Sequence, residues 1–161
     1  MSDPLQLAVN NTISLYNISL IASAGNDGTD SCVATPARSV YVAAIGATDI
    51  NDQRPLFSNH GKCVNAYAPG EHIRCAAPGD MFVSMSGTSM ACPIVAGLAA
   101  GYLEYNPALR YFDIVDIIYF SRSRGFTATI DPPIIQIPVC AKSLIPDFTN
   151  SSSEQLSLIH I

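Results

Sequence analysis

The sequence predicts an α/β fold of three layers, in which helices flank a mostly parallel sheet. Segments of helical and strand type alternate along the chain in the order helix, strand, strand, loop, helix, helix. Such alternation is typical of α/β proteins. The 161 residues are 48% apolar and only 13% charged, about half of the usual charged share, so the chain can bury a substantial core.

The chain is expected to form one domain, because it has no internal repeat and no long linker. Its net charge of −5 leaves no basic surface for nucleic acid or for an anionic membrane. Neither is therefore expected as a partner. The first residues, Met1 to Pro4, lack the basic segment and the apolar core of a secretory signal.

The first two elements of this pattern are a helix near the start of the chain and an apolar strand over residues 18–22. The strand leads into Gly-Asn-Asp-Gly at residues 25–28, which is a strong turn signal. A simple reversal of the chain is one interpretation of this turn. Ligand binding is the other, because α/β sheets bind ligands at the carboxyl ends of their strands, where Asn26 would lie. A second buried strand is predicted over residues 40–47.

The stretch of 23 residues over 81–103 has no formal charge. A membrane span needs about 20 apolar residues, but Ser84, Ser86 and Gly87 suit a turn better than lipid. We therefore expect a turn followed by a buried helix over about residues 89–103. The small residues expected to pack that helix against the core are Ala96, Gly97, Ala100 and Gly101.

A further helix is expected to begin with Asn106 as its cap and Pro107 at its first position. The apolar residues expected on its buried face are Phe112, Val115, Ile118 and Tyr119. Residues 121–161 read as a divergent tail that we expect to be disordered, because its prolines argue against long regular elements.

The segment Ser-Gly-Thr-Ser-Met-Ala-Cys-Pro over residues 86–93 resembles the nucleophile segment of the subtilisin-like serine peptidases. This resemblance implies that Ser89 attacks the peptide carbonyl. Gly87 would permit a sharp turn before the serine. The helix that follows would direct its first free N–H groups toward an oxyanion beside Ser89.

The Gly25-Asn26 pair resembles the Ala-Ala-Gly-Asn segment of the same family. In that family the asparagine amide donates a hydrogen bond to the tetrahedral oxyanion, so the resemblance implies this role for Asn26. It also implies that Ser23, Ala24 and Gly25 contribute to substrate binding. The expected fold is therefore subtilisin-like, and incomplete in this chain.

The resemblance extends over about residues 4 to 120, so residues 1–120 read as the C-terminal half of a peptidase domain. The family triad runs in the order Asp, His, Ser, and its first two members precede the Gly-Asn strand. The residues before Asn26 contain no histidine. His60, His72 and His160 match no catalytic position and are interpreted as ordinary solvated histidines. The missing N-terminal half is thus an expected partner, and this chain alone is expected to be inactive.

Cys32 and Cys63 lie in loops on either side of the second strand. Resemblance to the proteinase K and convertase-like branches implies a disulfide between them and a secreted or lumenal location, with two reduced thiols as the alternative. Some family members hold calcium with an aspartate where Asn65 stands, and a neutral amide is a poorer calcium ligand. No cofactor is expected to be required, and calcium is not supported at Asn65.

The resulting prediction is a serine-type endopeptidase that cleaves peptide or protein substrates by acyl transfer through Ser89. One alternative is a non-catalytic relative that serves as a binding or regulatory module. Another is a truncated product that does not fold, because half of a parallel sheet leaves an open edge.

Overall fold

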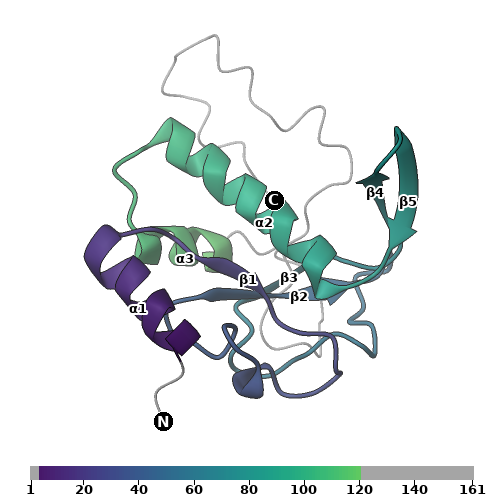
Figure 1. The fold of residues 1–161 in the computed structure, drawn as a ribbon, viewed down its shortest axis with the longest axis horizontal. Coiled ribbons are helices and arrows are strands. Elements are labelled where there is room, and N and C mark those ends of the chain that lie inside the picture. Colours follow the sequence, from purple (N-terminus) through teal and green to yellow (C-terminus); the bar gives the residue numbers. More distant parts are fainter. Residues whose placement is uncertain (1–3, 121–161) are drawn as a thin grey trace.

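The computed structural model describes residues 4–120, in which helices pack against a parallel sheet and a separate hairpin extends from one side (Figure 1). The elements in chain order are α1 (Pro4–Tyr16), β1 (Ile21–Ser23), the short 3-10 helix η1 (Ser31–Val33), β2 (Ala43–Thr48), β3 (Ala66–Pro69), β4 (Ile73–Ala77), β5 (Met81–Met85), α2 (Thr88–Tyr105) and α3 (Tyr111–Phe120).

The main sheet is parallel and has the strand order β1-β2-β3. Ile45 of β2 pairs with Ser23 on one side and with Ala66 on the other. All six residues of β2 are buried, as is typical of a central parallel strand covered on both faces. The predicted α/β fold with a parallel sheet is confirmed. The sequence pattern did not predict β3, a short strand whose last residue, Pro69, begins a proline-glycine turn.

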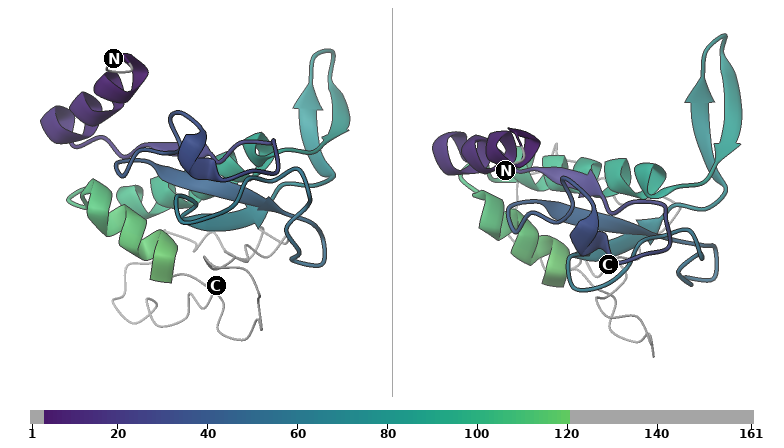
Figure 2. Two further views of the ribbon diagram at one scale, coloured as in Figure 1. Left: turned by 90° about the horizontal axis from the view of Figure 1, so that it is seen from below. Right: turned by 60° about the horizontal axis from the view of Figure 1, so that its bottom comes forward.

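Strands β4 and β5 form an antiparallel hairpin that projects from the body of the molecule (Figure 2). The expected turn over this stretch was therefore partly wrong, because residues Met81–Met85 are a strand. Every residue of β5 is exposed, so no alternation of polar and apolar side chains marks it as a strand. The Arg74 guanidinium lies 4.2 Å from the centre of the Phe82 ring across the hairpin.

Helix α2 packs along the main sheet through Ala91, Val95 and Ala99, which are spaced four residues apart and are buried. They contact the face of β2 that carries Ala43, Ile45 and Ala47. The expected packing through Ala96, Gly97, Ala100 and Gly101 was wrong, because Gly97 and Ala100 are exposed. The helix is apolar all round, so its sequence alone does not select the face that is buried.

Helix α3 begins at Tyr111, so the expected start at Pro107 was wrong. The Asn106 side chain instead accepts a hydrogen bond from the Ala108 N–H, which makes a turn. Asp113 reaches back and accepts from the Arg110 N–H at 2.7 Å, which caps the helix. The buried face carries Tyr111, Ile114 and Ile118, whereas Phe112 is 61% exposed, contrary to expectation.

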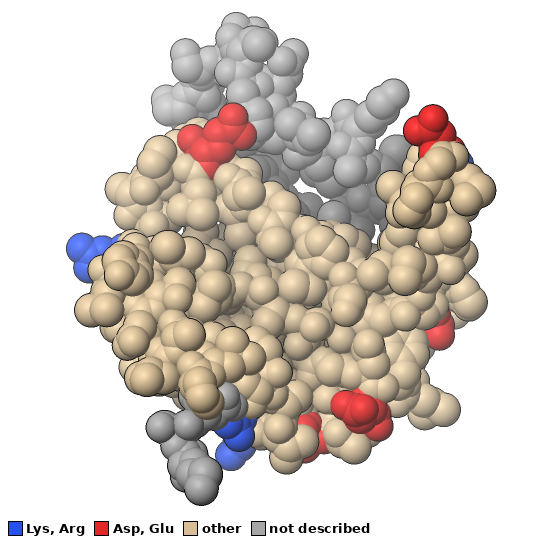
Figure 3. Space-filling model, viewed as in Figure 1, with Lys and Arg blue, Asp and Glu red and all other residues tan. Residues whose placement is uncertain are grey.

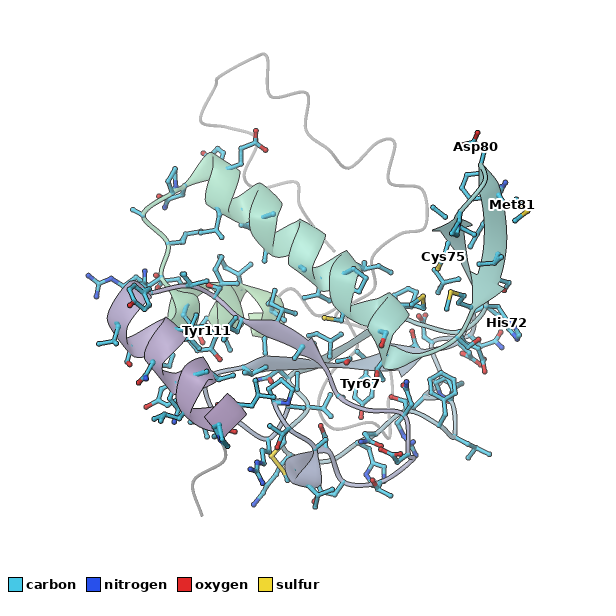
Figure 4. All side chains as sticks on the ribbon, in the orientation of Figure 1. Tyr67, His72, Cys75, Asp80, Met81 and Tyr111 are labelled. Carbon is cyan, nitrogen blue, oxygen red and sulfur yellow. A yellow bond between two sulfur atoms is a disulfide. The ribbon has the colours of Figure 1, made fainter. Side chains whose placement is uncertain are left out.

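The Tyr111 side chain is buried at the start of α3, and burial raises its pKa from 10.0 to about 12 (Figure 4). Between these two values the phenol ionises in the unfolded chain but stays neutral in the folded one. We therefore predict that the free energy of unfolding falls as pH rises from 10 to about 12, by an amount on the order of 1 kcal/mol after allowance for solvent screening. Chemical denaturation at several alkaline pH values measures this fall.

Tyr111→Phe should remove this part of the alkaline loss, while Tyr105→Phe, at an exposed position, should leave it unchanged. An identical alkaline profile for wild type and Tyr111→Phe would contradict the assignment.

Within residues 4–120, no helix is both long and apolar enough to cross a membrane. The predicted tail at 121–161 and His160 lie outside the described residues.

Candidate functional site

Ser89 is exposed in the first turn of α2, directly after the buried Thr88. Backbone N–H groups in the first turn of a helix have no partner within the helix, and they carry its positive dipole end. The Ser89 hydroxyl and the Ser89 N–H therefore meet solvent at the same end of α2. An exposed alcohol beside free donors is the arrangement that acyl transfer requires.

Asn26 follows β1 and meets the start of α2 through Thr88. Its side-chain oxygen accepts two hydrogen bonds of 2.8 Å, from the Thr88 N–H and from the Thr88 hydroxyl. Because an N–H can only donate, the atom that faces Thr88 must be Oδ1. The Asn26 Nδ2 group then points away from Thr88, and it makes no hydrogen bond within residues 4–120.

Gly87 lies between two hydrogen-bond donors, the Asn26 side-chain amide and the Ser89 backbone N–H. A Cβ atom at this position would lie 3.3 Å from Asn26 Nδ2 and 3.8 Å from the Ser89 backbone nitrogen. Both nitrogens therefore border the same small volume, which glycine keeps empty. An oxygen that enters this volume can accept from both donors, as a tetrahedral oxyanion does in an oxyanion hole. The structure thus brings together Ser89 and Asn26, which lie 63 positions apart in the sequence.

Ser23, Ala24 and Gly25 lie at the carboxyl end of β1, beside Asn26. The Ala24 N–H donates to the Ile45 carbonyl, and the Gly25 N–H donates to the Thr88 hydroxyl. The carbonyl oxygens of Ala24 and Gly25 both accept from Asn59. Because these backbone groups are already hydrogen-bonded, Ala24 and Gly25 can contact a substrate by packing against it. They have no free N–H or carbonyl group within the described residues with which to bind it.

Asn59 was not predicted as a site residue. Its side chain is fully buried and contacts the turn that carries Asn26. Its Oδ1 accepts from the Asp27 and Thr29 N–H groups, each at 3.0 Å, and its Nδ2 donates to the Ala24 carbonyl at 3.0 Å. The long-range contacts of Asn59 were not visible in the sequence. A polar residue directly after the buried Ser58 is the only local hint.

A disulfide joins Cys32 to Cys63, whose Cα atoms lie 5.2 Å apart. It closes a loop with a sequence separation of 31 and ties the segment after Asn26 to the segment after Asn59. Two backbone hydrogen bonds link the same two segments, one from the Ser31 N–H to the His60 carbonyl and one from the His60 N–H to the Thr29 carbonyl.

Replacing both Cys32 and Cys63 with serine should lower the free energy of unfolding by roughly 3 to 4 kcal/mol, because the open chain gains entropy when it unfolds. Chemical denaturation of the folded protein measures this loss. A reductant should destabilise the wild type but have no effect on the double variant. Equal sensitivity of both proteins to the reductant would contradict the prediction.

No described histidine is hydrogen-bonded to Ser89. His72 is exposed at the base of the hairpin, where its backbone N–H donates to the Ser86 hydroxyl at 2.9 Å (Figure 4). The backbone of the half-buried His60 pairs with that of Asp30 in an isolated parallel β-bridge. Neither is placed as a base for Ser89.

Two free cysteines lie near the start of α2. Burial raises the pKa of the Cys92 thiol, which keeps it protonated and a poor nucleophile. The Cys75 sulfur lies 3.1 Å from the Met90 sulfur, on the side of the hairpin that faces α2 (Figure 4).

The Asn65 side chain is held by a backbone contact, because its oxygen accepts a 2.8 Å hydrogen bond from the Ala44 N–H. Within residues 4–120, no three histidine, cysteine or acidic side chains cluster closely enough to hold a metal.

The chain matches the model of the Subtilase family over residues 2–125. It is 41% identical to isp6, a subtilase-type proteinase of Schizosaccharomyces pombe, over 71% of this chain and 25% of that protein. It is also 41% identical to an extracellular serine proteinase of a Thermus species, over 66% of this chain and 26% of that protein. The solved structure of a cold-adapted subtilisin-like serine proteinase superposes with a TM-score of 0.76 at 34% identity, covering 84% of this chain and 50% of that one. The chain spans about a quarter of the length of these curated relatives.

Proposed function

This chain belongs to the subtilase family, and we propose that it supplies the nucleophile and the oxyanion-binding groups of a serine-type endopeptidase. The observation that carries the proposal is the volume beside Gly87, which Asn26 Nδ2 and the Ser89 N–H both border. The exposed Ser89 hydroxyl lies on the same residue as the second donor.

In the proposed reaction the Ser89 oxygen attacks the carbonyl carbon of a peptide bond while a base takes the hydroxyl proton. The carbonyl oxygen becomes an oxyanion that accepts from Asn26 Nδ2 and from the Ser89 N–H. The C–N bond then breaks as the protonated base donates to the leaving amine. Water attacks the acyl-enzyme in the same way and restores Ser89. This chemistry needs no cofactor.

We assign the base to a part of the domain that these 161 residues do not contain. This assignment is supported by the absence of a hydrogen bond between Ser89 and any described histidine, and by the share of about a quarter that the chain covers in its relatives. An N-terminal half with the triad aspartate and histidine would complete the site. The chain alone should then be nearly inactive, because the serine without its base is a weak nucleophile.

The proposed substrates are peptides or proteins. Charged side chains are sparse on the face shown in Figure 3, and the net charge is −5, which argues against nucleic acid and anionic membranes as partners. The disulfide supports a secreted or lumenal location, and it favours the proteinase K and convertase-like branches.

A non-catalytic relative that binds peptides is the second candidate function. It is favoured by the same lack of a base at Ser89 within the described residues.

The two candidates are separated by a fluorophosphonate probe, which reacts with activated serines. The full-length protein and its Ser89→Ala variant are expressed and treated side by side. Labelling of the wild type alone is the result expected for the peptidase. A folded full-length protein that resists the probe would overturn the peptidase and favour the non-catalytic relative.

A further inference from the structure

We propose that Asn59 is a positioning residue for Asn26, holding the turn that aims the oxyanion donor; this inference rests on the proposed function. Asn59 is fully buried and lies on a different loop from both Ser89 and Asn26. It makes no hydrogen bond to Asn26 itself, so it acts through the backbone of the neighbouring residues.

The contacts of Asn59 surround Asn26 on both sides along the chain. Before Asn26, the Asn59 side chain donates to the Ala24 carbonyl and the Asn59 N–H donates to the Gly25 carbonyl, each at 3.0 Å. After Asn26, the Asn59 oxygen accepts from the N–H groups of Asp27 and Thr29. The backbone of Asn26 makes no hydrogen bond of its own within residues 4–120, so its neighbours determine its position.

The turn passes directly over the Asn59 amide. A Cβ atom on Gly25 would collide with the Asn59 side-chain nitrogen, and Gly25 has a φ of 108°, which other residues rarely adopt. The close approach leaves no room for the turn to move closer to Asn59.

An asparagine side chain is suited to this place because it combines a donor with an oxygen that has two lone pairs. Aspartate would keep the two acceptor bonds but lose the donor to Ala24. Alanine would lose all three and leave buried backbone groups unpaired, which proteins avoid.

Two different contacts therefore orient the oxyanion donor. Thr88 fixes the rotation of the Asn26 side chain through two hydrogen bonds to Oδ1. Asn59 fixes the backbone on which that side chain stands. If the backbone moved, Nδ2 would leave the volume beside Gly87 even with the Thr88 contact in place.

The first test does not depend on activity. In full-length protein labelled with ¹⁵N-asparagine, the Asn26 side-chain amide signal is assigned by its loss in Asn26→Ala. We expect Asn59→Ala to shift this signal and to speed its exchange with solvent. An unchanged Asn26 signal in Asn59→Ala would overturn the proposal, whether or not the protein is a peptidase.

The second test is a double-mutant cycle in peptide hydrolysis with Asn59→Ala, Asn26→Ala and both together. Asn59→Ala should lower kcat by about 10- to 100-fold with KM nearly unchanged, less than the loss of the donor itself. In the Asn26→Ala background, Asn59→Ala should lower kcat by about twofold or less, because the side chain that Asn59 positions is gone. Equal losses in both backgrounds would show a merely structural role and overturn the proposal.

Asn65→Ala is the matched control. It also removes an asparagine that accepts from a backbone N–H, that of Ala44, but it has no contact with the Asn26 turn. It should lower stability while kcat stays within about twofold of wild type. A wild type that does not hydrolyse peptides, with an Asn26 signal that moves in Asn59→Ala, would reject the proposed function and still support the positioning role.

Discussion

Replacing Ser89 with alanine should lower kcat for peptide hydrolysis by the full-length protein by about a million-fold, the loss seen when subtilisin loses its nucleophile. The reason is that in the proposed reaction Ser89 supplies the atom that forms the acyl-enzyme. Cys92, the next nucleophile along α2, is half-buried, and its raised pKa keeps it protonated. No group near the site is therefore expected to substitute for Ser89.

Steady-state hydrolysis of a chromogenic peptide measures this loss. Ser84→Ala is the matched control, because Ser84 is an exposed serine on β5 just before the nucleophile segment. The kcat of this variant should equal that of wild type. Substantial turnover by folded Ser89→Ala would show that another residue is the nucleophile. The residual rate should exceed that of water alone, since the oxyanion donors remain.

Ser89 and Asn26 could be nominated from the sequence because each lies in a short contiguous motif, and the structure places them close together. The parallel sheet could also be predicted, since buried parallel strands form apolar runs that end in turns. The predicted strands were displaced by a few residues from β1 and β2, as is usual for element boundaries.

The other contacts of the candidate site could not be predicted, because they join residues that are far apart in the sequence. The pairing of Asn26 with Thr88 spans 62 positions, and that of Ala24 with the Asn59 side chain spans 35. Nothing in the sequence around residue 59 specifies which backbone groups its amide will meet. Strand β5 of the hairpin was missed for another reason: all its residues are exposed, so it lacks the alternation that burial on one face imposes.

Replacing Asn26 with alanine should lower kcat by about 100- to 1000-fold and leave KM nearly unchanged. The Nδ2 donor is needed when negative charge develops on the carbonyl oxygen, so its loss weakens transition-state binding more than substrate binding. Hydrolysis rates over a range of peptide concentrations separate the two constants. Asn11→Ala, at an exposed site on α1, should change neither.

Asn26→Asp sharpens this prediction because aspartate has nearly the same shape. One carboxylate oxygen can still accept from both Thr88 donors, as Oδ1 does now. The other oxygen would take the place of Nδ2 beside Gly87 and would repel the oxyanion instead of donating to it. Asn26→Asp should therefore be at least as slow as Asn26→Ala, although it preserves the contact with Thr88. A rate near that of wild type would mean that Asn26 only holds the start of α2 in place and does not stabilise the oxyanion.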